Sequence, residues 1–74
     1  MNLTHEQLKL LIETAPSAEK ADELIEEATG LKNVSEKAAF IRGMFGVKIV
    51  GKTTSSYDQT DYFVMLETIV NGNI

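Results

Sequence analysis

The sequence predicts a mainly α-helical fold: a small bundle of three or four short helices with one short β-strand around residues 47–50. Two observations support this fold class. Apolar residues recur with helical spacing along most of the chain, and residues typical of helix ends separate the periodic segments. The chain has 74 residues. Because this length has room for one hydrophobic core, we expect residues 1–74 to form a single domain.

Three helices have recognisable ends. Side chains that can cap an N-terminus by accepting a hydrogen bond from a free backbone amide stand at Thr4, Ser17 and Asn33 or Ser35. Residues that interrupt or end a helix stand at Pro16, Gly30 and Gly46. The second helix should therefore span residues 18–29. Within the bundle we expect a core that includes Leu24, Phe40, Ile41 and Leu66.

The segment after the third helix is predicted to be a short strand. Residues 47–50 are short and β-branched, and Gly46 and Gly51 bound them. A single strand leaves unpaired backbone groups, so it should pair with residues 53–56, with residues 62–66 or with the same strand of another subunit. A polar loop should follow over residues 51–60.

Residues 61–70 fit two structures. Their apolar residues follow helical spacing, Asp58 or Thr60 could cap them, and Gly72 could end a helix, so we expect a helix. Several of them also have strand propensity. A strand here would give the alternative fold, an α+β domain with a C-terminal β-hairpin.

Charge is distributed unevenly along the chain, whose net charge is −4. Residues 1–31 hold two lysines and seven acidic residues, for a net charge of −5. Residues 32–52 hold five basic residues and one acidic residue, a net +4, and residues 53–74 hold three acidic residues, a net −3. This acidic–basic–acidic order is informative about the partners that the protein could bind, and not about its fold.

The second predicted helix carries an acidic face opposite its apolar face. Its members are Glu19, Asp22, Glu23, Glu26 and Glu27. Like charges four residues apart each cost an isolated helix about 0.2–0.5 kcal/mol. The simpler interpretation is a solvated face, partly neutralised by Lys32, Lys37 or Arg42. The alternative is that a partner protein with a basic surface binds these carboxylates.

Residues 46–53 match the phosphate-loop pattern G-x-x-x-x-G-K-T. That chemistry needs a strand before the first glycine and a helix that begins at the Lys-Thr pair. Here a helix is predicted before Gly46, and the residues after Lys52 have loop composition. We therefore interpret the match as accidental.

The remaining patterns argue against an enzyme, a metal site or a cofactor. The chain has no cysteine and one histidine, His5, which excludes the usual zinc ligand sets. Asp58 and Asp61 lack the other oxygen ligands of a calcium loop, and the sequence offers no His–Asp pairing that would activate Ser55 or Ser56. The scattered basic residues and the acidic remainder make nucleic-acid binding an unfavourable interpretation.

The expected function follows by elimination. The sequence shows neither a signal peptide nor an apolar run long enough to span a membrane, so we expect a cytoplasmic protein. We expect a small non-enzymatic protein-binding or regulatory module, of adaptor or inhibitor type, that acts through its charged surface. The alternative is a structural homo-oligomer assembled through residues 47–50 and through apolar helix faces.

Overall fold

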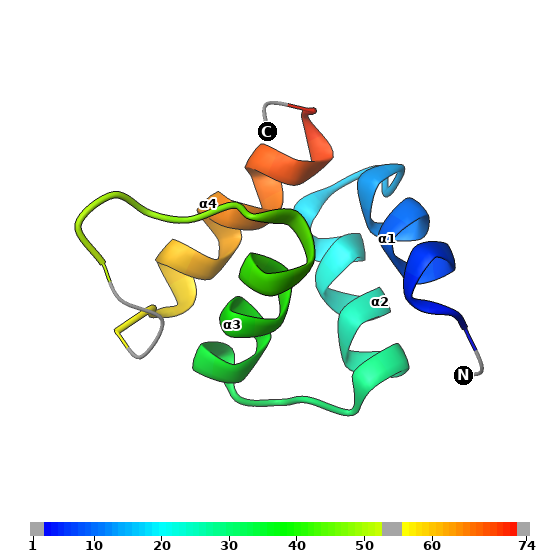
Figure 1. Cartoon of the computed structure of the whole chain (residues 1–74), viewed down its shortest axis with the longest axis horizontal. Coiled ribbons are helices and arrows are strands. Elements are labelled where there is room, and N and C mark those ends of the chain that lie inside the picture. The colour runs from blue at the N-terminus through cyan, green and yellow to red at the C-terminus, as the bar shows by residue number, and fades with distance from the viewer. Residues whose placement is uncertain (1–2, 53–55, 73–74) are drawn as a thin grey trace.

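The computed structural model describes residues 3–52 and 56–72, and it confirms a mainly α fold. The helices are α1 (His5–Glu13), α2 (Ala18–Thr29), α3 (Val34–Phe45) and α4 (Gln59–Val70) (Figure 1). The described residues contain no β-strand. The ambiguous segment at residues 61–70 thus belongs to a helix, and the alternative with a C-terminal hairpin is wrong.

The helix ends form as the local sequence predicts. Thr4 and Gln7 make a reciprocal capping box at α1, and Asp58 and Asp61 make a second one at α4. Ser17 caps α2, and the third N-cap is Asn33 rather than Ser35. Left-handed glycines follow α2 and α3, with φ angles of 74° at Gly30 and 73° at Gly46. Local hydrogen-bonding chemistry therefore fixes most helix bounds.

The strand predicted at residues 47–50 is wrong. This segment is a loop: Val47 is buried against the core, whereas Val50 is 93% exposed. The backbone amide of Lys52 donates to the carbonyl of Ile49 at 3.2 Å and closes a turn. Strand propensity largely measures packing against neighbouring strands, and residues 62–66, one expected neighbour, are helical. Of the other expected neighbour, residues 53–56, positions 53–55 lie outside the described residues.

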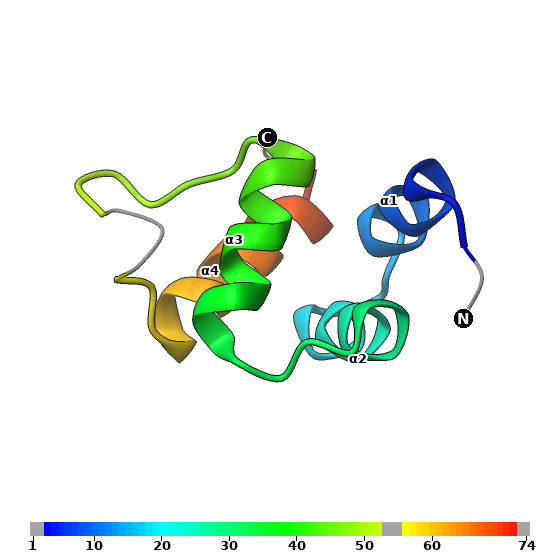
Figure 2. The ribbon, with the colours of Figure 1, turned by 60° about the horizontal axis from the view of Figure 1, so that its bottom comes forward.

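Helix α1 packs with α2 and α3 packs with α4, and the two pairs join mainly where α4 packs against α2 and α1. Figure 2 shows α1 and α2 on one side and α3 and α4 on the other. Helix α4 is thus the central element. Its inner face is fully or almost fully buried, at Tyr62, Met65, Leu66 and Ile69.

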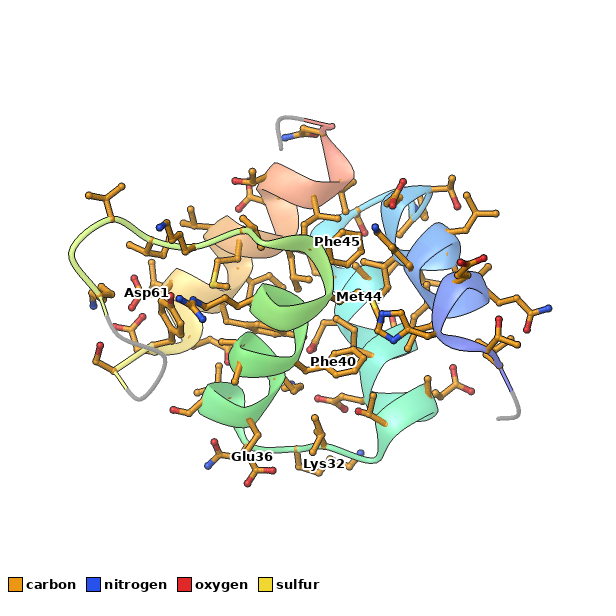
Figure 3. All side chains as sticks on the ribbon, in the orientation of Figure 1. Lys32, Glu36, Phe40, Met44, Phe45 and Asp61 are labelled. Atoms are coloured by element: carbon orange, nitrogen blue, oxygen red, sulfur yellow. The ribbon has the colours of Figure 1, made fainter. Side chains whose placement is uncertain are left out.

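Two of the four predicted core residues are buried and two are not. Ile41 and Leu66 have no exposed surface, but Leu24 and Phe40 are only partly buried. The prediction was wrong at these two because α3 packs on α4 rather than on α2. Figure 3 shows Phe40 on the side of α3 that faces α1 and α2, at the edge of the core.

Candidate protein-binding surface on helix α2

The structure divides the predicted acidic face of α2 into two groups. Asp22 and Glu26 turn toward α3 and α4, where both make hydrogen bonds with Lys37. The other three carboxylates, Glu19, Glu23 and Glu27, are exposed. The face is therefore not one continuous acidic surface, and each group has to be interpreted separately.

A buried lysine from α3 organises the inward group. The Nζ atom of Lys37 lies 2.8 Å from Asp22 Oδ1 and 2.6 Å from Glu26 Oε2, and its side chain is 5% exposed. The hydroxyl of Tyr62, on α4, donates to the same Asp22 oxygen at 2.7 Å. Lys37 Nζ also lies 5.0 Å from the centre of the Tyr62 ring. These four residues, here called the Lys37 cluster, connect three helices.

Electrostatic interactions within the Lys37 cluster favour the charged forms of Lys37 and Glu26. Burial lowers the pKa of Lys37, but hydrogen bonds and charges from Asp22 and Glu26 outweigh it, so this pKa lies above its ordinary value. The hydrogen bond from Lys37 is the main reason that the pKa of Glu26 is lowered. Burial raises the pKa of Tyr62, and its hydrogen bond to Asp22 adds to the effect. Tyr62 is thus a hydrogen-bond donor in this cluster at neutral pH.

The sequence pointed to three cations as internal partners for the acidic face, and their outcomes differ. Lys37 pairs closely, as described above. Lys32 Nζ lies 3.4 Å from Glu26 Oε1, but its side chain is 77% exposed, so this ion pair is weak. Arg42 is exposed and has no carboxylate partner within the described ranges.

Sequence reasoning missed the burial of Lys37 and the hydrogen bond of Tyr62 with Asp22. The spacing of Lys37 from its apolar neighbours in the sequence could have indicated that it is buried. Lys37 precedes Ile41 and Met44 by four and seven residues, so all three lie on one face of α3. A lysine on the same helix face as buried apolar residues needs carboxylate partners, and α2 supplies them.

The outward group forms what we call the acidic row: Glu19, Glu23 and Glu27. These residues follow one another at intervals of four, so their side chains are neighbours along the outer surface of α2. Within residues 3–52 and 56–72 none of the three has a basic side chain at ion-pair distance. Among the described residues, the acidic row is therefore solvated and forms no ion pair.

Two hollows adjoin the acidic row. One, of about 290 Å³, lies between the start of α2 and the end of α4 and includes Glu19 and Glu67. The other, of about 240 Å³, is lined by Glu23, Glu26, Glu27 and Lys32. The second hollow already contains a cation of the chain itself, whereas none of the described residues that line the first is basic.

The phosphate-loop match does not have phosphate-loop geometry in its described part. Gly46 ends helix α3, so a helix rather than a strand precedes the first glycine. Lys52 Nζ lies 2.8 Å from Asp61 Oδ2, and this hydrogen bond is the main cause that raises the pKa of Lys52. Thr53, the last residue of the motif, lies outside the described residues.

The other candidates have local structural roles or none that the structure assigns. Asp58 and Asp61 cap α4. His5 is exposed in the first turn of α1, and Ser56 is exposed in the loop before α4. Ser55 lies outside the described residues. Among the described side chains no group of three or more could hold a metal ion. No described helix combines the length and apolar character of a membrane crossing.

Comparison of the chain with protein-family models, with curated proteins and with solved structures finds no match.

Proposed function

We propose that this protein is a small non-enzymatic binding module, of adaptor or inhibitor type, whose acidic row contacts a basic surface of another protein. The observation that carries the proposal is the division of the α2 carboxylates. Asp22 and Glu26 stabilise the fold through Lys37, whereas Glu19, Glu23 and Glu27 have no such role in the described structure. The acidic row keeps its like-charge repulsion, which a basic partner would relieve.

The charge of the acidic row suits partner encounter more than tight binding. Exposed charges act over a Debye length of about 8 Å at physiological ionic strength. They speed association and select a complementary surface, while a single exposed ion pair adds little affinity. A cytoplasmic location is part of this proposal, since a small secreted domain of this size would usually be stabilised by disulfides and the chain has no cysteine.

The test compares two double variants with the same net charge. Glu23→Gln with Glu27→Gln removes two charges of the acidic row. Glu6→Gln with Glu13→Gln removes two exposed charges of α1 and is the control. Both variants should fold. Proteins captured from the native lysate by the immobilised natural chain should also be captured by the α1 variant but lost with the α2 variant.

The kinetics of a captured protein then complete the test. Its association rate should fall in the α2 variant and with added salt, while its dissociation rate changes less. Equal association rates for the natural chain and the α2 variant would refute a role for the acidic row.

A structural homo-oligomer remains the second candidate, now without the strand. Leu10 is 62% exposed on α1, and its neighbour Leu11 is also exposed. These side chains would be covered if α1 packed against a second copy of the chain. Light scattering over a wide range of concentrations separates the candidates, because an obligate oligomer keeps its mass on dilution. Leu10→Gln should then dissociate such an oligomer.

A further inference from the structure

We infer that the hollow between α2 and α4 receives a lysine or arginine side chain of the partner protein. This inference rests on the proposed function, and it adds α4 to the binding surface and names the chemistry that is bound. The hollow, here called the α2–α4 hollow, lies where the first turn of α2 approaches the last turn of α4. Figure 1 shows these two helix ends close to each other.

The walls of the α2–α4 hollow match the two parts of a long cationic side chain. Pro16, Ala18 and Val70 supply apolar surface, against which the methylene groups of lysine or arginine can pack. Glu19 from α2 and Glu67 from α4 supply one carboxylate each. A volume of about 290 Å³ is space for about ten waters, so a long side chain and some water fit there.

The α2–α4 hollow is negatively charged, because its two glutamates outweigh the partial charges of the two helix ends. The start of α2 contributes about half a positive charge and the end of α4 about half a negative charge, so the two helix ends nearly cancel. Two full negative charges remain, on Glu19 and Glu67. Within the described residues neither carboxylate forms an ion pair, and the last turn of α4 contains no basic residue.

The second hollow beside the acidic row is a poorer receptor for the same ligand. Lys32 lines it, and Glu26 in its wall already pairs with both Lys32 and Lys37. A cation from a partner would have to compete with these two lysines. The α2–α4 hollow therefore offers the better site for an anchoring cation, and the rest of the acidic row guides the partner toward it.

The experiment is a titration of the full chain, followed by the chemical shifts of its backbone amides in NMR spectra. The probe is the blocked tripeptide acetyl-Gly-Arg-Gly-amide, and its control is the same peptide with neutral citrulline in place of arginine. We expect saturable shifts at Ser17–Glu19 and at Glu67–Asn71 with the arginine peptide, and none with the citrulline peptide. Glu67→Gln should weaken binding about twofold to fivefold, the range expected for one exposed ion pair.

A matched variant separates this site from a general attraction to negative charge. Glu6→Gln removes one charge from α1, far along the chain from both walls, and should leave the dissociation constant unchanged. The inference is overturned if Glu67→Gln binds as tightly as the natural chain, or if the shifts lie along Glu23 and Glu27 instead. The latter result would leave the proposed function standing, because the acidic row would still bind the cation.

Discussion

Lys37 and Asp22 form an ion pair with 2.8 Å between Nζ and Oδ1, and both side chains are largely shielded from water, at 5% and 19% exposed. This pair connects α3 to α2, although α3 packs mainly on α4. A charged contact therefore links two helices that otherwise approach each other at few places.

Replacing Lys37 with Met should destabilise the protein by about 3 kcal/mol, since breaking a buried ion pair leaves uncompensated carboxylates behind. Urea unfolding at neutral pH measures the loss. The variant that combines Lys37→Met with Asp22→Asn and Glu26→Gln should regain most of it, because no charge is then left without a partner. A Lys37→Met protein as stable as the natural chain would contradict the structure of the cluster.

Single substitutions should separate the two groups of carboxylates by the sign of their effect. Glu23→Gln removes repulsion from Glu19 and Glu27 and should raise the free energy of unfolding by about 0.2–0.5 kcal/mol for each pair. Glu26→Gln should lower it, because Glu26 loses two lysine partners. Urea unfolding of both variants in the same buffer provides the comparison. A loss of stability in Glu23→Gln would mean that the acidic row is paired within the molecule.

Acid should destabilise the natural chain partly through Glu26. The pKa of Glu26 is lowered in the folded chain from an ordinary value of 4.5. A lowered pKa contributes stability that is complete above the unfolded value and is lost as the pH falls through the folded value. Thermal midpoints measured from pH 7 down to about pH 2 should therefore fall less steeply in Glu26→Gln. Glu6→Gln, which leaves the Lys37 cluster intact, should follow the natural chain.

The local signals in the sequence were sufficient for the helices and insufficient for the surfaces between them. Caps such as Thr4 and Asn33 depend on a few neighbouring residues, so they were predictable from the sequence. The strand at residues 47–50 failed because a strand needs a partner that local sequence does not specify. The acidic face was found as a pattern, but its division required the position of Lys37, which depends on how α3 packs.

The loss of stability on truncating a residue of α3 should depend on how fully the helix packing buries that residue. Ile41 is fully buried, so Ile41→Ala should cost about 2–5 kcal/mol. Phe40 was expected in the core, but it is partly buried at the edge of the core, and Phe40→Ala should cost less than Ile41→Ala. Urea unfolding ranks the two variants. The reverse order would mean that α3 is rotated relative to the structure described here.

The phosphate-loop match at residues 46–53 should not bind a nucleotide. The ammonium group of Lys52 already pairs with Asp61. A helix rather than a strand precedes Gly46, so the described part of the motif lacks both the available lysine and the strand of a phosphate loop. Titration of ATP or GTP with magnesium should release no heat and leave the thermal midpoint unchanged. Lys52→Ala should lower that midpoint slightly, because the first turn of α4 loses its ion pair, and this change should be the same with and without nucleotide. A rise of the midpoint with nucleotide in the natural chain, absent in Lys52→Ala, would restore nucleotide binding as a function of this loop.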